Sequence, residues 1–442
     1  MKASCTIQLH AAGVWHDVAS VSLHGLESEG WKAKTYSGYA LEWAFEHTGA
    51  SDAHALCARW PVGLEPLQVP HWPVFLIDML PQGYGRQELL RRIGKSPMAD
   101  IGADWKLLLV GAGNPVGNLR VKEAAQWLQD NAGAVRGFSD DEVAQRADEF
   151  SEYLASHGLF VAGSSGVQGE WPKVLLTRAE DGLLYLDHTL PDERAVAHYI
   201  VKFGRGTDPQ LASILRHEAP YMAIARLLDL RVHAPLALRQ RALFIPRFDR
   251  VVRDGTVVRL AQESIATLTG IPGFEAVPSH DQVCLALLRH CTRPQEEVLE
   301  YLRRDVANLA LGNKDNHARN TALQRDFEGR IALTPLYDFA PMYLHPDGIA
   351  RRIRWTDNDG GQPDWGRVLD RMCELGAQVQ RERRHRGPDL VQRATLRDGL
   401  RAMAPVLQRI AQDGQALGLE PAVLNHLRPG ILARAAELAT LV

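Results

Sequence analysis

The chain has 442 residues, 45% of them hydrophobic and 23% charged, a composition that excludes a disordered or fibrous protein and is typical of roughly two to three packed lobes. Its net charge of −3 excludes a global attraction to nucleic acid or anionic lipid. The five cysteines are widely spaced and form no CxxC pair, which argues against a disulfide framework or structural zinc site, and the absence of a signal-like start or long apolar segment predicts a cytoplasmic protein without membrane contact.

The chain begins with a β-rich pattern. Short alternating stretches at residues 6–9 and 18–23, with glycine and proline between them, are typical of strands. The pattern turns helical over residues 72–93, and a strand over residues 118–121 follows a glycine-rich turn. We therefore expect residues 1–125 to form a small β-rich N-terminal subdomain.

Residues 126–250 have the pattern of an α/β nucleotide-binding lobe. A predicted helix over residues 140–156 is followed by a loop rich in glycine and serine. Residues 198–203 form an apolar, β-branched stretch that is typical of a buried strand and carries one lysine. A helix over residues 210–228 and a strand over residues 242–246 are predicted next.

Helical periodicity dominates from residue 262 onwards. The predicted helices cover residues 282–291, 295–311, 365–381, 398–413 and 421–441. The predicted fold class is therefore α+β with two lobes, an α/β N-terminal lobe that includes the β-rich subdomain and a mostly helical C-terminal lobe over residues 251–442. A cleft between two such lobes is the usual place for a ligand.

The most informative segment contains Asp315 and Asn320. Their spacing, D-x-x-x-x-N, is that of the catalytic loop of protein kinases. Two short apolar stretches with a turn between them follow, and Asp338-Phe339-Ala340 then stands where kinases place D-F-G. We predict that Asp315 orients a hydroxyl group and accepts its proton, and that Asn320 and Asp338 bind magnesium.

Two neighbours extend this predicted site. His317 is expected to orient Asp315 or the loop, and Arg319 is expected to lie against phosphate oxygens. Taken singly, Asp, Asn and His most often cap helices and turns. The joint pattern of loop, hairpin and Asp-Phe favours catalysis over that simpler interpretation.

The N-terminal half offers a complementary lysine. Lys202 ends an apolar strand, as the phosphate-pairing lysine does in protein kinases, and Glu218 on the next helix is placed to form an ion pair with it. The loop at residues 162–173 would bring backbone N–H groups to phosphates, with Lys173 neutralising charge. Residues 245–249 are placed to offer backbone groups to adenine. The alternative interpretation of Lys202 is an edge-strand lysine, and that of residues 162–173 is a flexible surface loop.

These motifs together resemble the HipA family of serine/threonine kinases, the toxins of bacterial toxin–antitoxin pairs. The resemblance rests, in family order, on residues 166–168 with Lys173, and on residues 198–203, 247–250, 260–263, 313–320 and 333–338. It implies a two-lobed, protein-kinase-like fold. The chain departs from the family pattern at three places. Residues 169–171 are added, Gly163 stands in the place of the family's phosphoserine, and Ser264 follows residues 260–263. These departures are similar to the longer YjjJ-like subgroup.

The resemblance implies ATP and magnesium as cofactors and a catalytic set of Asp315, Lys202 and His317. It also implies an ATP site lined by Ser164, Ser165, Gly166, Gln168, Lys173, Lys202, Arg247, Phe248, His317, Arg319, Asn320 and Asp338. Kinases of this family inactivate themselves by phosphorylating a serine that ejects the phosphate loop. Ser165 is the first candidate for that serine and Ser164 the second.

The resemblance also implies partners. The family's toxins act on aminoacyl-tRNA synthetases, so the expected substrate is such an enzyme or another translation factor. A small HipB-like helix-turn-helix antitoxin would connect the chain to operator DNA. Two arginine clusters, within residues 351–354 and 381–386, are candidates for direct contact with nucleic acid, although such clusters are more often solvated helix ends.

Two other functions would use the same residues. A metal-dependent nuclease or nucleic-acid-binding toxin would use the carboxylates with magnesium for phosphodiester cleavage, and would leave Lys202 without a clear role. A pseudokinase would bind nucleotide as a regulatory module. The presence of Asp315 argues against a pure binding protein, because such a protein has no need of a catalytic base.

Overall fold

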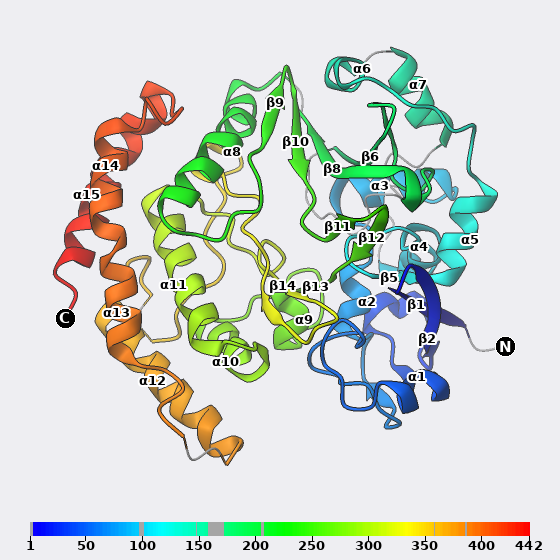
Figure 1. Ribbon diagram of the computed structural model, residues 1–442, viewed down its shortest axis with the longest axis horizontal. Coiled ribbons are helices and arrows are strands. Elements are labelled where there is room, and N and C mark those ends of the chain that lie inside the picture. Colours follow the sequence, from blue (N-terminus) through cyan, green and yellow to red (C-terminus); the bar gives the residue numbers. More distant parts are fainter. Residues whose placement is uncertain are drawn as a thin grey trace.

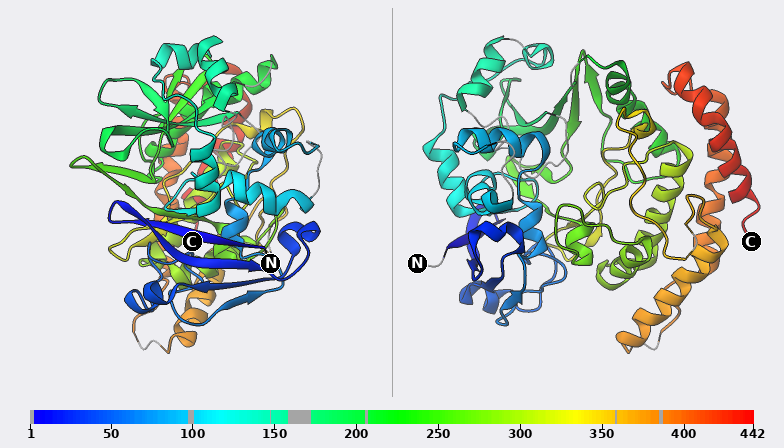
Figure 2. Two further views of the ribbon diagram at one scale, coloured as in Figure 1. Left: turned by 90° about the vertical axis from the view of Figure 1, so that its right-hand side faces the viewer. Right: turned by 180° about the vertical axis from the view of Figure 1, so that it is seen from behind.

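The computed structural model describes residues 3–96, 101–146, 148–157, 172–204, 207–357, 359–384 and 387–442. Three regions follow one another along the chain and across the molecule (Figure 1). The β-rich N-terminal region lies at one end, and the last four helices lie at the opposite end, as the view from behind also shows (Figure 2). Within the described residues, no helix is both long enough and apolar enough to span a bilayer.

An antiparallel sheet of strand order β4-β3-β2-β1-β5 forms the N-terminal region. Its first hairpin is tight because Ala12 and Gly13, with φ values of 48° and 81°, adopt the left-handed conformation that such turns require. The alternating stretches at residues 6–9 and 18–23 correctly predicted the two strands of this hairpin. The strands are β1 (Ser4–Ala11), β2 (Val14–Leu23), β3 (Thr35–Tyr39), β4 (Leu67–Val69) and β5 (Leu119–Val121).

The helices of this region are short. The predicted helical stretch over residues 72–93 is divided into α2 (Val74–Asp78) and α3 (Gly83–Arg92), because Pro81 has no backbone N–H with which to continue a helix. The side chains of α2 from Val74 to Ile77 are buried. The other helices are α1 (Leu41–Glu46), α4 (Asp104–Gly111) and α5 (Lys122–Asp130).

A second sheet, of strand order β7-β6-β8-β10-β9, forms the middle region. Phe203 and Phe244 on one face of this sheet pack against Phe150 of α7 (Asp148–His157) in one apolar cluster, whereas Leu243 on the other face packs against α8 (Pro209–Leu227). The strands are β6 (Lys173–Ala179), β7 (Leu184–Leu186), β8 (Ala195–Phe203), β9 (Ala237–Arg239) and β10 (Ala242–Pro246). The antiparallel register of β6 and β8 sets Lys173 directly opposite Lys202.

The predicted helix over residues 140–156 is interrupted. Its first part, α6 (Asp140–Gln145), ends where Arg146 adopts a φ of 51°, and α7 forms the second part. Ser139 caps α6 by accepting a hydrogen bond from the backbone N–H of Glu142. Helical periodicity alone does not reveal such a break, because the apolar residues of both pieces face the same sheet.

The C-terminal region is mostly helical but contains two small sheets. A hairpin, β11 (Arg250–Arg253) and β12 (Thr256–Arg259), precedes a sheet of order β13-β14-β15. The turn predicted between the two apolar stretches after Asn320 is confirmed by β14 (Ala322–Arg325) and β15 (Ile331–Leu333). Helical dominance from residue 262 was wrong for β13 (Ala261–Ser264), which is a strand because it pairs with the distant β14.

The helices of this region build the largest apolar core, which also takes up side chains of α8. They are α9 (Ile265–Thr269), α10 (His280–His290), α11 (Pro294–Ala310), α12 (Trp365–Glu382), α13 (Arg393–Arg401), α14 (Met403–Asp413) and α15 (Pro421–Ala439). The predicted helix over residues 398–413 is divided into parts of α13 and α14. The predicted domain boundaries at residues 125 and 250 stay a prediction, although each of the two larger sheets falls within one predicted range.

Candidate active site

The loop between α11 and β14 carries the predicted catalytic residues. At Gly312, which has a φ of 66°, a Cβ atom would lie 2.7 Å from the ring of Tyr343, so glycine is required. The Asn320 side chain donates a hydrogen bond of 2.8 Å to the backbone carbonyl of Asp315, and its backbone N–H donates to the carbonyl of His317 at 3.0 Å. The loop is thereby closed on itself, and Asp315 and Asn320 line one small pocket.

His317 lies beside Asp315, with 3.7 Å between Nε2 and a carboxylate oxygen. Burial lowers the pKa of the His317 ring more than the Asp315 carboxylate raises it, so the ring is neutral at pH 7. Its Nδ1 accepts a hydrogen bond of 3.2 Å from the backbone N–H of Arg319. From this bond we assign the ring proton to Nε2, the atom that faces Asp315.

Asp338 follows the β14–β15 hairpin in the chain and contacts two lysines of the second sheet. Its carboxylate oxygens lie 3.3 Å from Nζ of Lys173 and 3.2 Å from Nζ of Lys202. Burial alone would raise the pKa of the Asp338 carboxyl, but the two ammonium groups outweigh it and hold that pKa well below its ordinary value. The φ of Asp338 is 49°, a backbone conformation that costs a non-glycine residue energy and is typical of functional sites.

The predicted ion pair between Lys202 and Glu218 is confirmed. Nζ of Lys202 lies 2.7 Å from a carboxylate oxygen of Glu218 on α8, and both side chains are buried. Burial lowers the pKa of Lys202, but Glu218 and Asp338 together raise it above its ordinary value. The lysine therefore stays charged between a carboxylate of α8 and a carboxylate of the C-terminal region, an arrangement that active protein kinases share.

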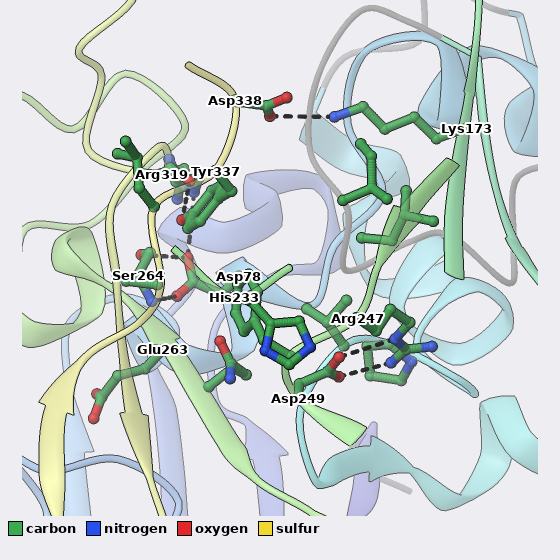
Figure 3. Close-up of a pocket in the computed structure, with 18 of the residues that line it drawn as sticks. Asp78, Lys173, His233, Arg247, Asp249, Glu263, Ser264, Arg319, Tyr337 and Asp338 are labelled. Atoms are coloured by element: carbon green, nitrogen blue, oxygen red, sulfur yellow. Dashed lines mark hydrogen bonds and ion pairs between the residues drawn. The ribbon is translucent and has the colours of Figure 1, made fainter. Parts of the chain in front are cut away.

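Lys173, Glu218 and Asp338 line a large pocket between the two lobes, and Figure 3 shows Lys173 and Asp338 at one end of it. Its empty volume is about 1370 Å³, which includes the part open to solvent. Asp338 lines both this pocket and the smaller one that contains Asp315 and Asn320. The apolar walls come from both lobes and include Ile200, Met222, Ile245, Phe248 and Leu336.

Arg247 and Phe248 line the same pocket, and Figure 3 shows Arg247 on the side away from Asp338. The Arg247 guanidinium is fully buried and donates two hydrogen bonds, of 2.9 and 2.7 Å, to the Asp249 carboxylate. A third, of 3.2 Å, goes to Asp187. The Phe248 ring lies 5.9 Å from that of Tyr337. The predicted contacts of Arg247 and Phe248 with ATP stay predictions.

Comparison with known proteins assigns the chain to a family. The sequence model of the HipA-like C-terminal domain matches residues 165–397, more than half of the chain. The chain belongs to the HipA-like family. A relative from Sinorhizobium fredii named "Putative kinase Y4mE" is 27% identical over 408 residues, which cover 86% of this chain and 88% of the relative.

The fold of the HipA family extends over the whole chain. A chain from the solved complex of the Shewanella oneidensis MR-1 toxin–antitoxin system HipA, HipB and its operator DNA superimposes with a TM-score of 0.62 at 16% identity. The match covers 97% of this chain and 96% of that chain. It confirms the predicted two-lobed α+β fold, whereas assignment to the YjjJ-like subgroup stays a prediction.

Four predicted residues of this HipA-family site, Ser164, Ser165, Gly166 and Gln168, lie outside the described residues. Their contacts with ATP, and autophosphorylation of Ser165 or Ser164, stay predictions. Lys173, at the end of the same segment, is described and buried, and it faces Asp338.

Sequence reasoning missed two residues that contact Arg319. Asp78, the last residue of α2, lies 3.2 Å from Nε of Arg319. The Tyr337 hydroxyl donates a hydrogen bond of 2.9 Å to the Arg319 carbonyl. All three residues line the pocket shown in Figure 3. Asp78 and Arg319 are 241 positions apart, so no local pattern connects them. The predicted contact of Arg319 with phosphate stays a prediction.

The residues predicted to hold magnesium are compatible with that ion. The Asn320 amide nitrogen is committed to the Asp315 carbonyl, which leaves the amide oxygen as its available ligand atom, and the Asp338 carboxylate is ionised. Among the described residues, no three His, Cys, Asp or Glu side chains converge on a metal site. A magnesium ion here would therefore need nucleotide phosphates and water as further ligands, which is the usual arrangement in kinases.

The first predicted arginine cluster is largely neutralised. Arg351 lies 2.8 Å from Asp305 and also pairs with Asp359, and Arg352 pairs with Glu275. In the second cluster, Arg383 donates to the carbonyl of Arg289. These partners indicate a structural use for three arginines of the two clusters.

Proposed function

We propose that this HipA-family protein is a serine/threonine protein kinase that uses ATP and magnesium. The observation that supports the proposal most is the row of alternating charges Glu218, Lys202, Asp338 and Lys173 at the boundary between the lobes. Such a row presents two buried lysines and an ionised carboxylate beside the pocket that contains Asp315. The nuclease alternative leaves Lys202, with its ion pair to Glu218, without a clear role.

The proposed nucleotide position follows from the pocket. The apolar walls around Ile200, Ile245 and Phe248 suit an adenine ring, and the lysines at the other end suit phosphate oxygens. Lys202 lies between Glu218 at 2.7 Å and Asp338 at 3.2 Å, which places its charge beside the carboxylate proposed to hold magnesium. Binding of phosphates there would replace part of the contact between Asp338 and the two lysines.

The proposed reaction is a direct phosphoryl transfer. The hydroxyl oxygen of a serine or threonine attacks the γ-phosphorus, the bond from that phosphorus to the bridging oxygen breaks, and ADP leaves with the electron pair. The Asp315 carboxylate accepts the hydroxyl proton, and the neutral His317 ring orients Asp315. Asn320 and Asp338 would hold magnesium, which neutralises phosphate charge when bound.

The proposal extends to substrate, partner and regulation. The substrate is a protein, of which an aminoacyl-tRNA synthetase or another translation factor is the first candidate. The Shewanella oneidensis complex contains HipB and operator DNA, and this supports a HipB-like helix-turn-helix partner for this chain. Phosphorylation of Ser165, with Ser164 as the alternative, would act as a brake on the same site.

Transfer of label from ATP tests this function. Purified wild-type protein, Asp315→Ala and a control variant, Asp347→Ala, are incubated with magnesium and γ-labelled ATP, with and without a cell lysate, and labelled sites are mapped by mass spectrometry. Asp347 is an exposed carboxylate outside the pockets. The proposal requires label with the wild type and the control but a loss of at least about 100-fold with Asp315→Ala.

The same preparations separate the alternatives. Nucleotide binding without transfer by any of the three proteins would indicate a pseudokinase. Breakdown of RNA or DNA in the absence of ATP by the wild type and Asp347→Ala, abolished in Asp315→Ala, would indicate a nuclease. Label on a serine or threonine of a lysate protein would identify the substrate.

A further inference from the structure

We propose that the β-rich N-terminal region is a working part of the active site, and that Asp78 is the positioning residue through which it acts. Asp78 holds Arg319, and Arg319 in turn holds the catalytic loop. This inference rests on the proposed kinase function, because it assigns a role in the turnover of that same site. It adds a residue that no motif of the catalytic loop contains.

The Arg319 side chain is held by three contacts. Its Nε lies 3.2 Å from Asp78, and its two Nη atoms donate hydrogen bonds of 2.9 Å to the carbonyls of Phe274 and Gly273. The side chain is buried. Because Arg319 directly precedes Asn320 in the chain, its guanidinium sets the position of a proposed magnesium ligand.

The Asp78 carboxylate is itself held rigidly. One oxygen accepts hydrogen bonds from the Ser264 hydroxyl, at 2.9 Å, and from Arg319. The other accepts from the Ser264 backbone N–H, at 3.0 Å, and from the Thr267 hydroxyl, at 2.6 Å. The two carboxylate oxygens therefore accept four hydrogen bonds in all. Asp78 is also the last residue of helix α2, whose first four residues are buried.

The other two contacts of Arg319 also depend on the N-terminal region. The carbonyls that it binds belong to the loop after α9, where Gly273 has a φ of 99°. A Cβ atom at Gly273 would lie 2.9 Å from the Trp31 ring, so this loop is packed directly against the N-terminal region. All three side-chain contacts of Arg319 therefore involve that region, either directly or through one packed residue.

The arrangement couples Arg319 to both proposed magnesium ligands. The Arg319 carbonyl accepts the hydrogen bond from Tyr337, and Tyr337 directly precedes Asp338. A displaced Arg319 would thus move Asn320 and Asp338 together. Since a displacement of about 1 Å costs roughly 100-fold in rate, the loss of Asp78 should reduce kcat far more than it reduces nucleotide affinity.

A double-mutant cycle on kcat tests the proposal with the full-length protein. Asp78→Ala is expected to lower kcat by about 10- to 100-fold, whereas affinity for an ATP analogue without magnesium changes less than about twofold. Asp17→Ala is the control, because it removes a half-exposed carboxylate of the same N-terminal region that pairs with Lys122 and lines neither pocket, and it should keep wild-type kcat. Arg319→Gln should lower kcat as Asp78→Ala does, and the double variant should lose no more than Arg319→Gln alone.

Independent losses that multiply in the double variant would overturn the proposal, as would an unchanged kcat in Asp78→Ala. If Asp78→Ala fails to fold, Asp78→Asn keeps the shape of the side chain and should give an intermediate loss. Amide hydrogen exchange separates this inference from the proposed function. Exchange over residues 313–320 should rise in Asp78→Ala and stay unchanged in Asp17→Ala even if the wild type transfers no phosphate, and an unchanged loop in Asp78→Ala would overturn the positioning role.

Discussion

Two buried groups of charges border the pocket, and they are built differently. The arginine group consists of Arg247 and Arg250 with Asp187 and Asp249. The lysine group consists of Lys173 and Lys202 with Asp338 and Glu218. Each group therefore has two cations and two anions. In the arginine group, the Asp249 carboxylate is saturated with hydrogen bonds. It accepts four, of 2.7 to 2.9 Å, from Arg247, Arg250 and the backbone N–H of Gly117.

In the lysine group, Asp338 is held more loosely than Asp249 is in the arginine group. Asp338 meets its two lysines at 3.2 and 3.3 Å, longer than the roughly 2.7–2.9 Å of strong charge-assisted bonds, and its side chain is 23% exposed. Planar guanidinium groups lock carboxylates in two directions, whereas ammonium groups act as point charges that change partners easily. The comparison teaches that the arginine group is built to maintain the fold, whereas in the proposed kinase the lysine group would exchange a carboxylate for phosphate.

The largest expected effect breaks the arginine group. Arg247→Met would leave Asp187 and Asp249 buried with much of their compensation removed, and such a change costs about 3–5 kcal/mol. The free energy of unfolding, measured by urea denaturation, should fall by that amount. Arg409→Met removes an exposed arginine that pairs with Asp413 at 3.7 Å and should leave stability unchanged. A similar small effect for both variants would contradict the structural role of the arginine group.

The lysine group should respond in rate rather than in stability. Asp338→Asn keeps the shape of the side chain but removes the charge that faces the two lysines and that is proposed to hold magnesium, so kcat should fall by about 10²- to 10³-fold. The urea midpoint should shift less than it does in Arg247→Met, because Lys202 keeps Glu218. Asp326→Asn, in the turn of the preceding β14–β15 hairpin, is the control, since Asn also supports the turn that this residue makes. Wild-type turnover in Asp338→Asn would refute the assignment.

A pH titration extends the comparison to His10, which lies near the arginine group. Burial, followed by the charge of Arg259, lowers the pKa of His10 to about 3, against an ordinary value of 6.5. The unfolded chain therefore binds the extra proton first, so the stability that His10 contributes is present above about pH 6.5 and is lost as the pH falls toward 3, by roughly 1.4 kcal/mol per pH unit.

The measurement is the free energy of unfolding between pH 4 and 6. In His10→Gln, the slope of this free energy against pH should fall by the equivalent of about one bound proton. His24→Gln, a change at an exposed histidine, is the control and should keep the wild-type slope. Equal slopes for the wild type and His10→Gln would show that His10 is charged in the folded protein.

The smallest expected effect concerns the outer support of α8. Glu420, which precedes α15, lies 2.8 Å from Arg216 on α8, but both side chains are nearly half exposed. Glu420→Gln should therefore cost no more than about 1 kcal/mol and should leave kcat within twofold of the wild type. A large loss of turnover would mean that α8 and its Glu218 are positioned from outside and not by Lys202.

Much of the site could be predicted because its residues lie close together in the sequence. The spacing of Asp315 and Asn320, the hairpin and Asp338 is a local pattern, and the loop and the hairpin form as predicted. Lys202 and Glu218 are 16 positions apart on a strand and the following helix, so their ion pair was also accessible to sequence reasoning.

By itself, the sequence determined the order of the elements, the catalytic loop and the lysine strand, since hydrophobic periodicity and motif spacing are properties of neighbouring residues. Only the tertiary structure decided that β13 is a strand, that Asp187 pairs with Arg247, and that Asp78 holds Arg319. Each of these contacts joins distant segments, and its partner is selected by burial, because a buried charge or strand edge must be satisfied wherever the fold brings a partner to it.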